Sequence, residues 1–172
     1  VDAFGFADES VRIALAEPVE RLARLIGSRS DETLAPQGLS VWARAQRTLQ
    51  PWEAWQTFRE WVERDMPRMG YSVARNLALS ASIPESDRDW AALMREEARA
   101  RLRFLLPTGT ILCMPTTPFP AVPKGLGLRD QTPLRNRIAC LCSHGGLTGV
   151  CQVSLPGAWA EGRPVGLSIV AA

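Results

Sequence analysis

The sequence predicts an α/β fold in which a helix-rich segment, residues 8–106, is followed by strands of a mixed β-sheet in residues 107–172. In the first segment, apolar residues recur at spacings of three and four, which is typical of amphipathic helices. In the second segment, short apolar runs are bounded by glycine and proline, which is typical of buried strands. A length of 172 residues fits one domain or a portion of a larger one, so we treat both segments as parts of a single domain, 1–172.

Composition and charge exclude several classes of protein. Hydrophobic residues make up 46% and charged residues 22% of the chain, as in globular proteins, and the formal net charge is only +2. Acidic and basic residues are mixed in residues 96–103, which indicates a solvated helical face and no nucleic-acid partner. No apolar run approaches the roughly 20 residues that cross a bilayer. Residues 1–8 do not resemble a secretion signal, so we expect a cytoplasmic protein without a membrane partner.

The first helix is predicted to begin after Asp8, a suitable N-cap, and to end at Gly27. Pro18 lies within its apolar pattern, so a kink or a break is expected there. Residues 28–37 are polar and contain glycine, serine and proline, which predicts a loop. The residues that set the helical pattern are Val11, Leu15, Val19, Leu22 and Ile26.

Further helices are predicted before the strand-containing segment. One helical pattern begins at Leu39, and Pro51 is expected to be the first residue of a new helix. A short helix then covers residues 71–81, and the longest helix of the chain opens at residues 82–85. Four tryptophans between residues 42 and 61 form either an aromatic face packed on the core or an aromatic wall beside a ligand.

The second segment is predicted to contain three strands and one helix. Residues 115–131 are expected to form a loop, because closely spaced prolines exclude both a helix and a central strand at its start. The helix follows from about Pro133 to Ser143, and residues 157–164 join the last two strands as a hairpin. The three strands cover residues 110–114, 151–155 and 165–170.

The cysteines and the one histidine carry the only nucleophile–base pattern that we find. Cys113, Cys140, Cys142 and Cys151 lie in apolar stretches and are expected to be reduced thiols. Their spacings match no zinc motif, so no metal is predicted, and a cluster of Cys140, Cys142 and His144 is kept as a minor alternative. Cys140 and His144 share a helix face, either as a thiolate with its base or as packing residues. No phosphate-loop or dinucleotide motif is present, so no cofactor is predicted.

Glycine, proline and serine recur in a characteristic order towards the end of the chain. Residues 146–157 read GLTGVCQVSLPG, residues 162–170 read GRPVGLSIV, and residues 111–118 read ILCMPTTP. The first two segments resemble the C-terminal signature of the amidase signature family, and the third resembles the family's apolar strand that runs into P-T-T-P. The helix at residues 11–22, V-x-x-A-L-A-x-x-V-E-R-L, is similar to the helix that follows the family's catalytic core. Residues 52–70, with WEAW, WVER and PRMG, look most like the branch of indoleacetamide hydrolase-like amidases.

The resemblance implies that the chain is the C-terminal portion of an amidase, which hydrolyses an amide carbon–nitrogen bond. Family members use a serine nucleophile, a bridging cis-serine and a lysine base, all of which precede the region matched here. Lys124, the only lysine, matches no catalytic position, so we expect the triad to lie outside this chain. The implied partners are a small-molecule amide substrate and the missing N-terminal half of the amidase.

The resemblance also assigns residues to a substrate pocket. The helix before the Gly146–Gly149 turn is expected to line the acyl side of the pocket, and the loop after the first strand is expected to rim it. The acidic position of the glutamine-specific branch falls near Ala139, which favours a small amide with an aryl or apolar acyl group. The residues assigned to the pocket are Cys140, Ser143, His144, Gly145, Thr116 and Thr117.

Two hypotheses from different classes remain open. In the first, the chain is a segment of an amidase that is inactive alone and active with its missing half. In the second, it is a stand-alone, non-catalytic α/β or interaction module derived from an amidase tail. In the isolated chain the predicted strands would leave a sheet edge unpaired. We therefore expect this fragment to be homo-oligomeric, partly molten or proteolytically derived unless the other half is bound.

Overall fold

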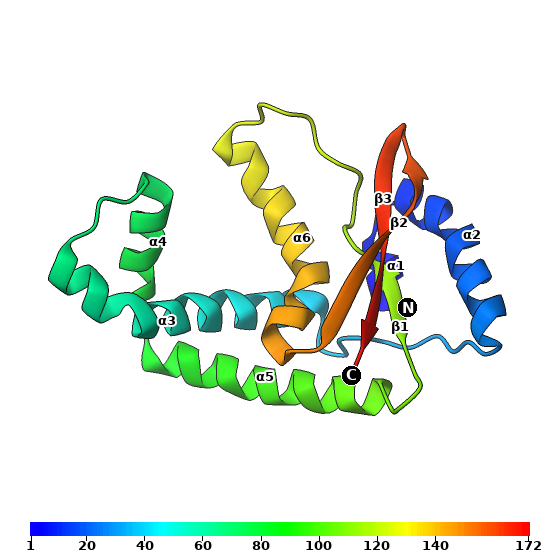
Figure 1. The fold of residues 1–172 in the computed structure, drawn as a ribbon, viewed down its shortest axis with the longest axis horizontal. Coiled ribbons are helices and arrows are strands. Elements are labelled where there is room, and N and C mark those ends of the chain that lie inside the picture. Colours follow the sequence, from blue (N-terminus) through cyan, green and yellow to red (C-terminus); the bar gives the residue numbers. More distant parts are fainter.

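The computed structural model describes residues 1–172, apart from the side chain of Leu128. Helices fill most of the first 105 residues, and the strands follow, as the sequence predicts for an α/β fold (Figure 1). The elements are α1 (Asp2–Phe6), α2 (Glu9–Ile26), α3 (Leu39–Asp65), α4 (Tyr71–Ser80), α5 (Glu85–Leu105), β1 (Leu112–Pro115), α6 (Leu128–Thr148), β2 (Cys151–Ala160) and β3 (Arg163–Ala171).

Helix α2 has the predicted ends and no break. It starts after Asp8 and ends at Gly27, whose φ of 83° is a left-handed conformation that glycine adopts without strain. The Asp8 side chain makes no capping hydrogen bond; its carboxylate pairs with Arg137 of α6 at 2.6 Å. The helix continues through Pro18, because the buried residues on both sides of the proline pack against the sheet.

The predicted division at Pro51 is wrong, because α3 is one helix of 27 residues and is the longest helix described. Its buried residues, which include Trp42 and Leu49, all lie in the N-terminal half. The C-terminal half extends with α4 away from the strands (Figure 1), and Trp61 there is exposed. Of the four tryptophans, only Trp42 belongs to the buried core.

Strands β1, β3 and β2 form an antiparallel sheet in that order. The Thr116 N–H donates to the Gly166 carbonyl at 2.9 Å. Because backbone groups of an antiparallel strand point alternately to its two sides, this bond shows which residues of β1 direct their N–H and C=O groups towards β3. In this register, Pro115 and Pro156 occupy positions where an N–H would point away from β3, so neither proline removes a bond to the central strand.

The connection between β2 and β3 is shorter than predicted. Residues 158–160 continue to pair with β3 after a bulge at Gly157, where an added Cβ would lie 3.0 Å from Leu15 Cδ2. Only Glu161 and Gly162 form the turn, with φ of 52° and 71°. Two positive φ values are the requirement of the tight hairpin turns that match strand twist.

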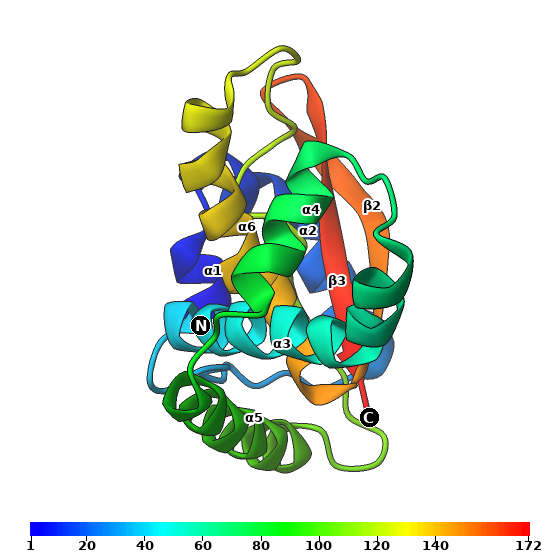
Figure 2. The same ribbon diagram turned by 90° about the vertical axis from the view of Figure 1, so that its left-hand side faces the viewer.

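Two apolar clusters cover the two faces of the sheet. Helix α2 packs on one face, where Leu15 meets Leu167 of β3, while α3, α5 and α6 build the larger cluster around Val170 on the other face (Figure 1). Helices α3 and α5 lie side by side at one end of the molecule (Figure 2). Helix α6 is longer at both ends than predicted and contains Gly146, where an added Cβ would lie 2.6 Å from Gln46 Nε2 of α3.

The described residues contain neither a membrane-spanning helix nor a cluster of metal-binding side chains. No helix within residues 1–172 combines the length and apolar character needed to cross a bilayer. Among the described side chains, no group of three or more His, Cys, Asp or Glu residues is placed to hold a metal ion, and Cys140, Cys142 and His144 do not form such a group.

The cluster under α2 predicts a specific loss of stability. Leu15 is fully buried, so Leu15→Ala should lower the free energy of unfolding by about 2–5 kcal/mol through lost burial and an incompletely refilled cavity. Ile13 is 68% exposed on the same helix, so Ile13→Ala should change it by no more than about 0.5 kcal/mol. Urea unfolding followed by circular dichroism measures both values, and equal effects would contradict the packing of α2.

Candidate functional site

A row of polar side chains crosses the sheet on the face towards α6. It contains Thr116, Gln152, Ser154 and Ser168, which we name the polar row. The Thr116 hydroxyl lies 2.8 Å from Ser154 Oγ and 2.9 Å from Ser168 Oγ. The Gln152 Nε2 group donates to Ser168 Oγ at 2.8 Å. The four side chains therefore form one hydrogen-bonded chain that ties β1, β2 and β3 together.

The polar row follows from the alternation of strand residues. Ser154 and Ser168 are register partners, and Met114 of β1 also pairs with Ser168, so these positions share one face of the sheet. Gly166, two residues before Ser168, lies on the same face. An added Cβ there would stand 2.8 Å from both the Ser154 and Thr116 hydroxyl oxygens, so the close approach of these hydroxyls requires glycine.

Helix α6 borders the polar row. The Cys142 thiol donates to the Thr116 carbonyl at 3.4 Å, and an added Cβ at Gly145 would lie 3.3 Å from Gln152 Oε1. The absence of a side chain at Gly145 thus leaves room for the Gln152 carboxamide. The Thr116 loop is consequently held by β3 on one side and by α6 on the other.

His144, on the same helix α6, is only 1% exposed. Neither of its ring nitrogens has a hydrogen-bond partner among the described residues. Burial lowers the pKa of His144 to about 4, and the nearby Leu141 backbone and Gln152 side chain offset part of that shift. His144 is therefore neutral at pH 7 and offers one donor and one acceptor nitrogen.

The structure separates the six predicted pocket residues into two groups. Thr116, His144 and Gly145 lie in or beside the polar row. The Thr117 hydroxyl instead donates to the Phe119 carbonyl at 2.9 Å within its own loop. Cys140 lies in the apolar cluster formed with α3 and α5, and Ser143 Oγ is buried without a partner in the described part of the chain.

The Cys140–His144 pair does not have the properties of a nucleophile and its base. Burial raises the pKa of the Cys140 thiol above its ordinary value, and the nearby charges of Arg47 and Arg137 only partly offset this. His144 carries no hydrogen bond to a thiol among the residues described. The interpretation of the pair as packing residues at the end of α6 accounts for both observations.

The sequence motifs did not assign Gln152, Ser154, Ser168 or Cys142 to the pocket. Gln152 and Ser154 alternate within one strand, and Gly166 and Ser168 alternate within the next, so polar residues repeat with the period of a strand inside apolar runs. This pattern would have placed them on one face. The contact with Cys142 depends on the packing of α6, which no strand pattern reveals.

A separate cavity of about 450 Å³ lies beside β1. Its lining comes from α2, the loop at residues 28–32 and the segment 109–113, together with Val1, Phe4 and Leu105. None of the six predicted pocket residues is among the described residues that line it, so this cavity is distinct from the polar row.

Comparison with known proteins identifies relatives over nearly the whole chain. The chain is 31% identical over 160 residues to Amidase 1 of Oryza sativa subsp. japonica, which covers 91% of this chain and 37% of that protein. It is 27% identical over 130 residues to Outer envelope protein 64, chloroplastic, of Arabidopsis thaliana, covering 74% of this chain and 22% of that protein. No protein-family model matches the sequence.

Solved structures agree with these relatives. A crystal structure of an amidase superimposes with a TM-score of 0.73 and 27% identity, over 98% of this chain and 39% of that one. A bacterial aryl acylamidase of the amidase signature enzymes shares the fold with a TM-score of 0.67 and 15% identity, over 100% of this chain and 39% of that one.

The fold and the relatives together define an amidase-related α/β protein. The chain belongs to the amidase signature family, as its sequence motifs predict. It spans only about two fifths of the length of the two solved structures and 37% of the rice enzyme, which is consistent with the predicted C-terminal portion.

The close contact at Gly166 predicts the effect of one methyl group. Gly166→Ala should lower the free energy of unfolding by about 1–3 kcal/mol, because the new Cβ must displace two short side chains. Adding Ser154→Ala removes one of the two hydroxyls and should restore part of that loss. Gly5→Ala, at a helical position with open space, should stabilise by up to about 1 kcal/mol. Denaturant titration tests the series, and a neutral Gly166→Ala would contradict the arrangement.

Burial of His144 predicts a pH dependence of stability. Its folded pKa of about 4 lies below the unfolded value of 6.5, so the unfolded chain binds more protons between these values. Stability should therefore fall as the pH decreases from 6.5 to 4, by roughly 2 kcal/mol from this group. His144→Leu should lose that component, and the difference between the two urea midpoints, measured at pH 7 and pH 4.5, isolates it. Parallel pH profiles would show that His144 is not buried in neutral form.

Proposed function

We propose that this chain forms one wall of the substrate pocket of an amidase that hydrolyses a small, uncharged amide. Membership in the amidase signature family and the amidase relatives support this reaction class. The observation that carries the assignment of the wall is the polar row, where four uncharged hydrogen-bonding side chains converge beside neutral His144.

The chemistry of the polar row favours an uncharged substrate. Hydroxyl and carboxamide groups can donate to a substrate carbonyl and accept from its amide N–H. They carry no formal charge, and a charged ligand group placed against them would lose hydration without gaining an ion pair. The aryl or apolar acyl group remains a prediction from the sequence position near Ala139. The likeness to indoleacetamide hydrolase-like enzymes remains a prediction from the motifs at residues 52–70.

The groups that attack the amide are proposed to lie in the part of the family's length that this chain does not span. A lysine base must be held neutral by burial, whereas Lys124 is exposed. The partners proposed are therefore the remaining amidase portion and a small-molecule amide. A cytoplasmic location is proposed on the four free cysteines.

An activity assay tests this function. The isolated 172-residue chain should release no ammonia from phenylacetamide or indole-3-acetamide, whereas the complete polypeptide that contains it should release ammonia. In that polypeptide, Ser154→Ala should raise KM by roughly 3- to 10-fold, the value of one hydrogen bond. Leu25→Ala, at a position 84% exposed on α2, is the matched control and should leave KM unchanged. An unchanged KM in a folded Ser154→Ala enzyme would contradict the pocket wall.

A second candidate function is a non-catalytic interaction module. The observation that favours it is the relative named Outer envelope protein 64, chloroplastic, whose name describes a location and not an enzyme. The same assay distinguishes the two candidates, because a complete and folded polypeptide that hydrolyses neither amide would support the non-catalytic alternative.

A further inference from the structure

We propose that the distal part of α3, together with α4, is a docking surface for the same surface of a second copy of this protein. We name residues 52–80 the arm, because they extend together away from the strands (Figure 1). The inference goes beyond the proposed function and does not rest on it, since no residue of the arm belongs to the polar row. The uncovered apolar faces of the arm and its charges each point to a second copy as the occupant.

The distal part of α3 has an apolar face that is only partly covered. Between residues 52 and 65, apolar side chains recur at spacings of three and four, which places them on one side of the helix. Phe58 and Trp61 on this side are 48% and 43% exposed, and their ring centroids lie 6.3 Å apart in an edge-to-face arrangement. Large aromatic side chains gain most from burial, so this face favours a further packing partner. The residues of the face are Ala54, Trp55, Phe58, Trp61 and Val62.

Helix α4 has an uncovered apolar face of its own. It packs back on α3, yet among its ten residues only Leu77 and Ser80 are not classed with the exposed side chains. Val73, Leu77 and the two alanines of α4 share one side of the helix, and Val73 there is exposed. A helix of this length is marginal on its own and gains stability mainly by burying its apolar face. Contact with α3 alone leaves that face largely open.

The exposed side chains of the arm are of the kinds that protein interfaces contain. Aromatic residues, methionine and arginine are enriched at such interfaces. The arm exposes Phe58, Trp61, Met66 and Tyr71. Small ligands bind in concave pockets, whereas none of the described residues that line the 450 Å³ cavity belongs to the arm. The surface therefore suits a protein partner more than a small molecule.

The charges of one arm complement those of a second arm. Residues 52–65 contain four acidic and two basic side chains, whereas residues 66–80 contain two basic and no acidic side chains. Among the described side chains, Glu60 and Arg75 are exposed and take part in no ion pair. In a two-fold symmetric pair, the acidic part of each arm can face the basic part of the other, so the favourable contact is made twice.

The same charges disfavour a membrane as the occupant. Helices that lie on anionic lipid carry an excess of lysine and arginine on their polar face. The arm as a whole has four acidic and four basic side chains. Its polar surface therefore lacks the positive charge by which anionic headgroups attract a protein.

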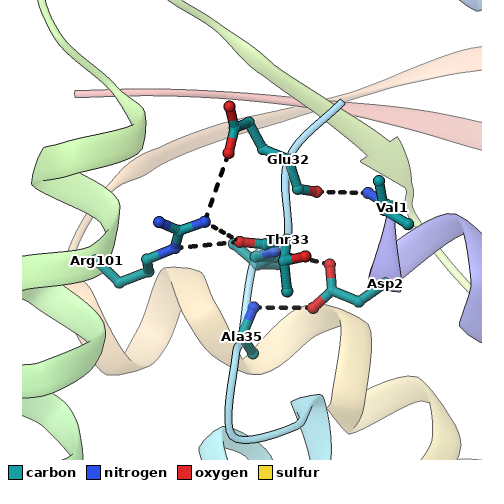
Figure 3. Close-up of polar contacts among 7 residues, drawn as sticks. Val1, Asp2, Glu32, Thr33, Ala35 and Arg101 are labelled. Atoms are coloured by element: carbon teal, nitrogen blue, oxygen red, sulfur yellow. Dashed lines mark hydrogen bonds and ion pairs between the residues drawn. The ribbon is translucent and has the colours of Figure 1, made fainter. Parts of the chain in front are cut away.

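Polar contacts hold the arm in a fixed position relative to the core. The loop before α3 is tied to Asp2, which accepts two of its backbone N–H groups at 2.7 and 2.8 Å, and to Arg101 of α5, which donates to one of its carbonyls (Figure 3). At the base of the arm, Arg95 of α5 pairs with Glu53 at 2.7 Å. Because the surface is preorganised, docking orders little additional structure.

Sedimentation velocity of the complete polypeptide that contains these residues tests the inference. This polypeptide should sediment as a dimer at roughly 100 μM, well above a micromolar Kd. Phe58→Glu places a charge in the apolar face and should raise the Kd of the dimer at least roughly tenfold. Phe104→Glu, at a position of α5 that is 71% exposed and outside the arm, is the matched control and should leave that Kd unchanged. Circular dichroism checks that both variants are folded.

A charge exchange provides a second test at exposed positions, where folding is not at stake. Arg75→Glu should weaken the dimer, because acidic residues of the two arms would then face one another. Adding Glu60→Arg should restore part of the affinity, because opposite charges would face again. Two charge changes with equal and additive losses would contradict the complementary arrangement.

Two outcomes would overturn the inference. A complete polypeptide that stays monomeric at roughly 100 μM would assign the cover of the arm to the same chain. A dimer whose Kd is unaffected by Phe58→Glu and by Arg75→Glu would join its copies through another surface, such as the unpaired sheet edge. Binding of the monomer to vesicles of anionic lipid, lost in Phe58→Glu, would identify a membrane as the occupant instead.

Discussion

The two-sided alternation of β3 is the constraint on which the rest of the structure depends. Val165 and Leu167 face α2, while Gly166, Ser168 and Val170 face the helices on the other side. A shift of one residue would bury the serine under α2 and expose the leucine, because strand residues alternate between faces. Both apolar clusters therefore require the same register, and the polar row is a consequence of it.

This constraint explains why uncharged polar groups occur in an otherwise apolar strand. Ser168 is fully buried, and its hydroxyl is satisfied by Thr116 and Gln152. Buried polar groups are costly without such partners and nearly neutral with them. His144 differs, since both of its nitrogens lack partners among the described residues, and only its neutral state at pH 7 makes that burial tolerable.

Local sequence patterns predicted which helices and strands form more accurately than they predicted where each helix or strand ends. Helix α2 was predictable because its apolar spacing and Gly27 both act within a few residues. The continuity of α3 through Pro51 was not, because tertiary packing outweighs the local penalty of a proline. The extension of β2 to Ala160 depends on pairing with β3 across a bulge, which a single-strand pattern does not contain.

The candidate site was predictable only in part for a related reason. Family motifs selected Thr116, His144 and Gly145, which lie at the seam between α6 and the sheet. The same motifs selected Cys140, whose side chain instead packs in the apolar cluster with residues of α3 and α5. That packing is set by tertiary contacts and not by its neighbours in sequence. Residues that meet only through packing, such as Cys142 and Thr116, have no signal in the sequence.

A double-mutant cycle between Thr116 and Ser168 tests the central claim, that one register of β3 joins the three strands through the polar row. The single changes Thr116→Val and Ser168→Ala each remove one hydroxyl of a contact of 2.9 Å. The account predicts a coupling free energy of at least about 0.5 kcal/mol from urea unfolding of the four proteins. Strictly additive effects of the two changes would contradict it.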